Sequence, residues 1–176
     1  VFNGKSPNAP NANHPWKLKI TNHNPEDILL ERDTSVKFEV VNPHGTQVAG
    51  AAIANSAGEE RGVAPGAAWA GLQLGNYGFT DSAISQALSH EKQAIDIYNN
   101  SWGTTFRGVV LPGATWTLEN GVETGRNGLG NAFIFSGGNS RQQHDNVNYN
   151  PLANSRYTLA VGAVDHVGNQ AVYSTP

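Results

Sequence analysis

The chain contains His44-Gly45-Thr46-Gln47-Val48-Ala49-Gly50, a histidine placed directly before a glycine and a run of small residues. Small side chains continue through Ala51, Ala52 and Ala54, so a helix over about 45–55 can lie close against a neighbouring sheet. Gly45 leaves space beside the imidazole. This pattern predicts a histidine mounted on a helix and pointing into a cleft, where imidazole can act as a base near neutral pH. It also fits a histidine that only begins a helix.

Helical and strand patterns alternate after this segment. Helices are predicted at about 45–55, at 81–90 with Thr80 as the cap, and at 114–124. Strands are predicted at 69–74, 95–99, 132–136 and 158–163, after a loop at 1–13 and a short strand at 36–41. The alternation predicts an α/β fold with a mostly parallel sheet and helices on both faces.

Two of the predicted strands end in polar and small residues. Ser101-Trp102-Gly103 follows one strand, and Ser136-Gly137-Gly138 closes the other and leads into Asn139. Parallel α/β sheets bind ligands at the carboxyl ends of their strands, so we expect these segments to form a site. For Asn139 the alternative is an ordinary turn residue after two glycines.

Taken together, these segments resemble the subtilisin-like serine peptidases, and the second half is most similar to their kexin-like branch. The resemblance runs almost without a break from His44 to Pro176, and it includes Gly62-Val63-Ala64-Pro65, the glycine-rich 121–130 and Tyr157-Thr158-Leu159-Ala160-Val161-Gly162-Ala163-Val164-Asp165. It implies a three-layer subtilisin-like fold, expected to be incomplete at both ends. Residues 1–176 would be one partial peptidase domain, with an irregular part at 1–43 and a strongly family-like core at 44–176.

The resemblance also implies roles for individual residues. His44 would be the general base, and Asn139 would donate its side-chain amide to the oxyanion. The segments Ser101-Trp102-Gly103 and Ser136-Gly137-Gly138 would line the pocket for the residue before the cut. Gly75 and Tyr77 belong to a stretch similar to the edge segment that pairs with an extended peptide, although an ordinary loop fits them equally well.

Two members of the family's Asp-His-Ser triad are missing from the expected places. No Gly-Thr-Ser turn occurs in the 176 residues, so the nucleophilic serine is expected past Pro176. Asn3 takes the place of the aspartate in a loose alignment, and Trp16 replaces an acid nearby; otherwise the aspartate precedes Val1. This chain alone is therefore expected to be inactive. The alternative function is a catalytically inactive subtilisin-like module that binds peptides.

Acidic residues that mark the kexin-like branch are largely absent. By resemblance, Asn150 stands where an acid would contact a basic substrate side chain, so a strict preference for arginine or lysine is not expected. Asp145 matches one acid of a calcium site and Thr175 replaces another. The implied reaction requires no cofactor. Calcium binding is left open, although most of the residues that would bind the ion by resemblance are missing from this chain. We favour Asp145 as a surface or turn acid over a metal ligand.

Composition narrows the partners. The formal net charge is −3 with both signs interspersed, so nucleic acid is not an expected partner. No apolar run reaches the length of a membrane span, so a membrane is not expected either. The chain has no cysteine. An extended peptide or protein substrate is expected, together with the remainder of the domain itself. No signal peptide is evident, and a secreted or extracellular location is suggested by the resemblance alone. A nucleotide-binding domain is disfavoured, because the glycines at 125–130 follow a helix and precede a strand, the reverse of the order that phosphate binding requires.

Overall fold

The computed structural model describes residues 44–55, 61–72, 74, 79–103 and 107–176. The chain divides into two compact units, Val1–Gly71 and Leu72–Pro176. The predicted loop at 1–13 and the predicted strand at 36–41 lie outside the described residues.

The described part of the first unit is built around helix α1, His44–Ile53. This confirms the helix predicted at about 45–55. The chain then returns along the end of the helix: the N–H groups of Gly62 and Ala64 donate to the carbonyls of Ala54 and Ala52, with N to O distances of 2.9 and 2.8 Å. Carbonyls at the end of a helix have no following helical turn to donate N–H groups to them, and here the returning chain supplies those donors.

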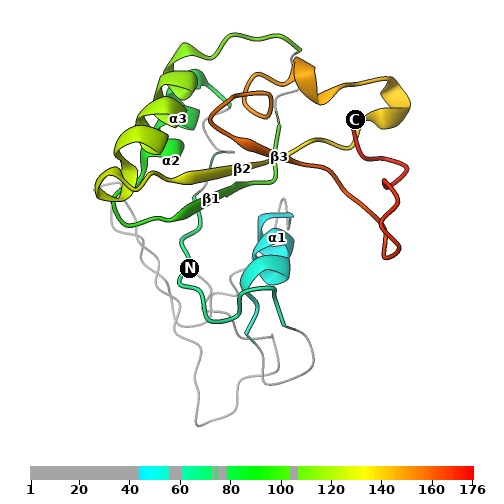
Figure 1. Ribbon diagram of the computed structural model, residues 1–176, viewed down its shortest axis with the longest axis horizontal. Helices are drawn as coiled ribbons and strands as arrows, with labels where there is room; N and C mark the ends of the chain where they lie inside the picture. Colours follow the sequence, from blue (N-terminus) through cyan, green and yellow to red (C-terminus); the bar gives the residue numbers. More distant parts are fainter. Residues whose placement is uncertain (1–43, 56–60, 73, 75–78, 104–106) are drawn as a thin grey trace, which may run out of the picture. The chain divides into compact units, whose positions relative to one another are not determined.

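The second unit contains a three-stranded sheet in the order β1-β2-β3, with both neighbouring pairs parallel. The strands are β1 (Ile97–Asn100), β2 (Ala132–Ser136) and β3 (Leu159–Val161). Helices α2 (Asp81–Ser89) and α3 (Pro112–Thr124) lie side by side over one face of this sheet (Figure 1). Short 3-10 segments η2, η3 and η4 follow at Gly125–Gly128, Arg141–Gln143 and Val147–Tyr149. The α/β fold with parallel strands is confirmed, and a helical layer on the other face stays a prediction.

The hydrophobic core lies between the two helices and the sheet. Helix α2 contributes Ile84 and Leu88, four residues apart, and α3 buries the positions Ala114, Thr117, Leu118 and Gly121. These spacings put each set on one helical face. The rings of Tyr98 in β1 and Phe133 in β2 stack with their centroids 4.9 Å apart beneath the helices.

The two helices begin with different caps. The Thr80 hydroxyl accepts the N–H of Ala83 at 3.2 Å, which confirms the predicted cap of α2. Helix α3 begins at Pro112, two residues before the predicted start, and receives no side-chain hydrogen bond from its own N-cap residue. The carboxylate of Asp81 takes that role from the neighbouring helix, because its two oxygens accept the N–H groups of Gly113 and Ala114, each at 2.8 Å.

Strand β1 begins at Ile97 and not at Ile95 as predicted. The N–H of Ile95 donates to the carbonyl of Glu91 in a turn, and its carbonyl accepts from the Asn131 side chain at 2.7 Å. Both backbone groups of Ile95 are therefore committed outside the sheet.

The predicted strand at 158–163 is shorter in the structure, where β3 covers Leu159–Val161. The N–H of Thr158 donates to Ser155 in a turn, and the N–H of Ala163 donates to the hydroxyl of Ser174. Neither amide is left for the ladder with β2.

The strand predicted at 69–74 is wrong for the residues that the structure describes there, 69–72 and 74, which have no regular structure. A strand forms only where its backbone hydrogen-bonds to a neighbouring strand. A run of apolar residues does not show that such a neighbour is present.

In the described parts of the chain, no helix combines the length and the apolar character needed to cross a membrane.

Candidate active site

Strands β1 and β2 bring the two polar segments to one edge of the sheet. The strands are parallel neighbours, with Asn100 at the end of β1 paired with Phe135 near the end of β2. Ser101-Trp102-Gly103 therefore leaves the sheet beside Ser136-Gly137-Gly138. The two segments lie together at the carboxyl edge, as the sequence predicted, and this edge is where parallel α/β sheets hold their ligands.

Trp102 fixes the first segment to the core. Its ring packs edge-on to Phe135, with the centroids 5.5 Å apart, and contacts Phe79 on another side, also at 5.5 Å. Ser101 is held as well, because its hydroxyl accepts the Asn99 side-chain amide at 3.0 Å. The segment is therefore held in place by the ring contacts of Trp102 and by the hydrogen bond to Ser101.

The second segment is fixed through Thr175. Gly138 has a φ of +102°, a backbone conformation that favours glycine, and its carbonyl accepts the N–H of Thr175 at 3.0 Å. The Thr175 hydroxyl in turn accepts the N–H of Ser140 at 2.9 Å. Asn139 lies between these two anchored positions and is exposed, and its amide makes no hydrogen bond with the described residues. An exposed amide that no described residue engages is available to donate a hydrogen bond to an anion.

Asp145 follows the second segment along the chain, where its N–H donates to the carbonyl of Ser140, and its carboxylate is paired with a cation of the protein. Its Oδ1 is buried and accepts no hydrogen bond from the described residues, but Arg107 Nε lies 3.2 Å away as an ion-pair partner. The described residues contain no group of three or more histidine, cysteine, aspartate or glutamate side chains that could hold a metal ion. Calcium takes six to eight oxygen ligands, so a single carboxylate next to a guanidinium does not fit it.

His44 is the first residue of α1 and is exposed, so the structure places the imidazole at the head of a helix. Its role as a base stays a prediction. Gly75 and Tyr77, the predicted edge segment, lie outside the described residues.

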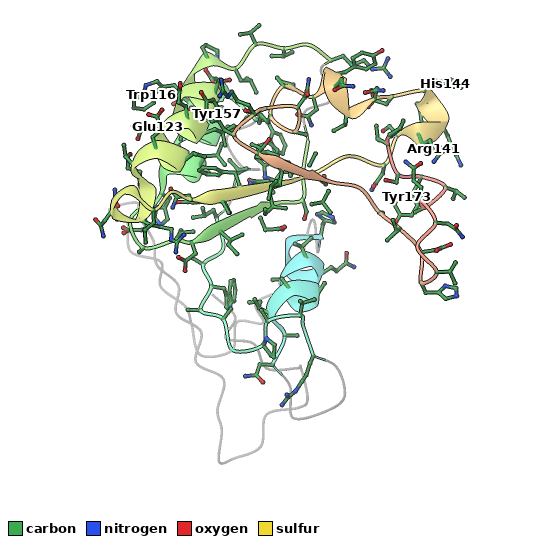
Figure 2. The ribbon with its side chains drawn as sticks, in the orientation of Figure 1. Trp116, Glu123, Arg141, His144, Tyr157 and Tyr173 are labelled. Atoms are coloured by element: carbon green, nitrogen blue, oxygen red, sulfur yellow. The ribbon has the colours of Figure 1, made fainter. Side chains whose placement is uncertain are left out.

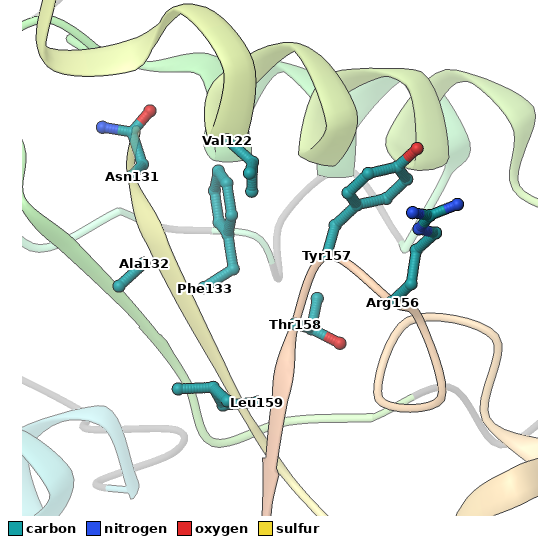
Figure 3. Close-up of a pocket in the computed structure, with 8 residues that line it drawn as sticks. All are labelled: Val122, Asn131, Ala132, Phe133, Arg156, Tyr157, Thr158 and Leu159. Carbon is teal, nitrogen blue, oxygen red and sulfur yellow. The ribbon is translucent and has the colours of Figure 1, made fainter. Parts of the chain in front are cut away.

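A cavity of about 210 Å³ opens elsewhere in the second unit, at the amino ends of β2 and β3 (Figure 3). It is lined by Val122, Asn131, Ala132, Phe133, Arg156, Tyr157, Thr158 and Leu159. Tyr157 donates a hydrogen bond of 2.6 Å to Glu119, and this bond is the main reason that the pKa of Tyr157 is raised. The cavity is at the opposite end of the strands from the two polar segments, so it is not part of the candidate site.

Comparison with known proteins identifies the family. The model of the subtilase family, peptidase S8, matches residues 12–176. Proprotein convertase subtilisin/kexin type 7 of Mus musculus is 39% identical over 139 residues, covering 76% of this chain and 18% of the relative. The dibasic-processing endoprotease of Schizosaccharomyces pombe is 40% identical over 129 residues, covering 69% and 18%. Furin of Homo sapiens is 35% identical over 139 residues, covering 76% and 18%.

The chain thus spans less than a fifth of the length of these relatives. The family match takes in nearly all of it, including both polar segments and His44. The kexin-like resemblance agrees with the names of the relatives. This chain is a member of the subtilase family.

Proposed function

We propose that the chain forms part of a serine endopeptidase in which His44 is the general base and Asn139 is the oxyanion donor. The observation that carries this proposal is the carboxyl edge of β1 and β2. Two anchored segments leave the sheet together there, and the exposed Asn139 follows directly in a chain of the subtilase family.

The chemistry assigns a task to each residue. A serine hydroxyl attacks the peptide carbonyl, and the His44 imidazole accepts the hydroxyl proton and later gives it to the leaving amine. The carbonyl oxygen becomes negatively charged, and the Asn139 amide donates a hydrogen bond to it. In subtilisin, removing one such asparagine donor lowers kcat by about 10²–10³-fold, which corresponds to about 3–4 kcal/mol of the barrier. The segments 101–103 and 136–138 would hold the substrate backbone and the side chain before the cut.

The serine and the triad aspartate are supplied, in this proposal, by parts of the protein other than the described residues. A chain limited to the 176 residues is expected to leave casein intact. The alternative, an inactive module that binds peptides, rests on Asn3 and Trp16, which lie outside the described residues.

One experiment separates these two functions. The full-length protein that carries this chain is treated with a fluorophosphonate probe, which reacts with an activated serine, and is assayed on a mixed peptide library. We expect covalent labelling and peptide hydrolysis, both lost in His44→Ala. Peptide binding without labelling would support the inactive module, and labelling that survives His44→Ala would reject His44 as the base.

Two further proposals come from the resemblance. The protein would be secreted or extracellular. This is tested by measuring whether a cell that expresses the protein secretes it. Catalysis would need no cofactor, so hydrolysis should survive treatment with EDTA; loss of activity that calcium restores would contradict this.

A further inference from the structure

The turn that carries Asn139 is bonded to one residue, Thr175, on both sides of the asparagine. Before Asn139, the carbonyl of Gly138 accepts the N–H of Thr175 at 3.0 Å. After it, the N–H of Ser140 donates to the hydroxyl oxygen of Thr175 at 2.9 Å. One of these hydrogen bonds uses the Thr175 backbone, and the other uses its side chain.

The two hydrogen bonds hold the backbone on either side of Asn139. The Gly138 carbonyl belongs to the peptide unit before Asn139, and the Ser140 N–H belongs to the peptide unit after it. Each peptide unit is planar, so holding both units restricts rotation about the two backbone bonds between them. The direction of the Asn139 Cα–Cβ bond is then set, and only the side-chain torsions are left for the amide to adopt.

The Thr175 hydroxyl lies in a buried and closely packed place. Thr175 is 5% exposed, so water does not readily replace the hydroxyl as the acceptor for Ser140. A Cβ on Gly138 would stand 3.0 Å from Thr175 Oγ1, and Gly138 has a φ of +102°. The close approach of the hydroxyl to the turn therefore depends on a glycine at position 138.

The segment that contains Thr175 is itself bonded to the chain that follows the turn. The N–H of Arg141 donates to the Tyr173 carbonyl at 3.3 Å, and the N–H of Val147 donates to the Pro176 carbonyl at 2.9 Å. Figure 2 shows Arg141 and Tyr173 close together where these two segments meet. Residues on both sides of Thr175 are thus held by backbone hydrogen bonds, which gives the hydroxyl a defined position.

The hydroxyl of the preceding residue, Ser174, has a different task. Ser174 is fully buried, and its Oγ accepts the N–H of Ala163 at 2.9 Å. This bond holds the chain that follows β3 and not the turn at 138–140. Ser174 and Thr175 are therefore two adjacent buried hydroxyls that each accept one backbone N–H, at different places in the unit.

We propose that Thr175 is a positioning residue of the endopeptidase, whose hydroxyl acts through Ser140 to hold the Asn139 amide where the oxyanion forms. The role rests on the proposed function and adds to it a residue that does not touch the substrate. A donor stabilises the developing charge only when it stands about 2.7–3.1 Å from the charged oxygen. A small displacement of the turn should therefore lower turnover more than it lowers substrate binding.

The test uses the full-length protein and a peptide that the parent cleaves. Thr175→Val keeps the branched shape and the backbone N–H but removes the hydroxyl. We expect kcat to fall by about ten-fold or more while KM changes by less than about two-fold, because the bound ground state carries no oxyanion. Thr175→Ser retains the acceptor and should keep kcat within about three-fold of the parent.

Ser174→Ala is the matched control, since it removes the adjacent buried hydroxyl and leaves the turn at 138–140 bonded. We expect it to lower the urea midpoint about as much as Thr175→Val does, and to change kcat by less than about two-fold. An equal loss of kcat in the two variants would show a general effect of instability and overturn the positioning role. A Thr175→Val protein that does not fold would make the hydroxyl a structural group and overturn it too.

A double-mutant cycle with Asn139→Ala tests whether Thr175 acts through the asparagine. Once the amide is absent, Thr175→Val should lower kcat by less than about two-fold further. The same ten-fold loss in both backgrounds would place the effect of the hydroxyl elsewhere and contradict the inference.

Saturating fluorophosphonate labelling counts the active sites, so that kcat refers to folded enzyme, and it also separates two failures. A labelled parent whose kcat survives Thr175→Val refutes only the positioning role. An unlabelled parent that cleaves no peptide of the library refutes the proposed function, and the positioning role with it.

Discussion

Removing the Asp81 carboxylate should destabilise the second unit through the neighbouring helix. Asp81 accepts the N–H groups of Gly113 and Ala114 at 2.8 Å each, and α3 has no side-chain cap of its own. A lost helix cap costs about 1 kcal/mol, and loss of a negative charge at a helix N-terminus adds about 0.3–1 kcal/mol. Asp81 is half-buried, so water replaces part of the lost bonding. We therefore expect Asp81→Ala to lower the free energy of unfolding by about 2 kcal/mol.

The assay is urea unfolding followed by far-UV circular dichroism, with the slope of the transition held in common between variants. Asp81→Asn keeps one acceptor oxygen and should lose about half as much as Asp81→Ala. Ser82→Ala is the control at the next, exposed position and should change stability by less than about 0.5 kcal/mol. If Asp81→Ala costs no more than Ser82→Ala, the carboxylate does not cap α3 and the reasoning fails.

Two other predictions concern residues away from the candidate site. Gly125→Ala should lower the free energy of unfolding by about 1–3 kcal/mol, because its Cβ would stand 1.9 Å from Asn131 Oδ1; Gly66→Ala, with nothing within 4 Å, is the control, and equal urea midpoints for the two variants would contradict this. The pKa of Asp165 is lowered, first by the N–H of Asn169, so its contribution to stability should be present above the unfolded value of about 3.9 and lost as pH falls through the lower folded pKa. Thermal melts of Asp165→Asn and the parent should differ at pH 7 and converge in acid, and a difference independent of pH would reject the idea.

The sequence predicted best those elements whose signals are local. The cap Thr80 and the strand 132–136 are where the pattern placed them, because a hydroxyl before a helix and a short apolar run between turns carry their information within a few residues. The start of β1 was wrong because Asn131, 36 residues away, takes the Ile95 carbonyl. The early start of α3 depends in the same way on Asp81, from another helix.

The candidate site could likewise be predicted from the sequence only in part. The strand pattern predicted that 101–103 and 136–138 would meet, since parallel neighbours place their carboxyl ends together. Neither the ion pair between Arg107 and Asp145 nor the two hydrogen bonds that the Asn150 side-chain oxygen accepts, from the N–H groups of Leu152 and Ala153, could be predicted. Both depend on how loops fold back after the strands, and spacing in the sequence does not encode those contacts.

The most direct test of the central claim is the steady-state kinetics of Asn139→Ala in the full-length protein on a peptide that the parent cleaves. An oxyanion donor acts on charge that develops only in the transition state, so kcat should fall by about 10²–10³-fold while KM stays nearly unchanged. An unchanged kcat, or a loss that falls entirely on KM, would show that Asn139 does not serve the oxyanion and would contradict the account.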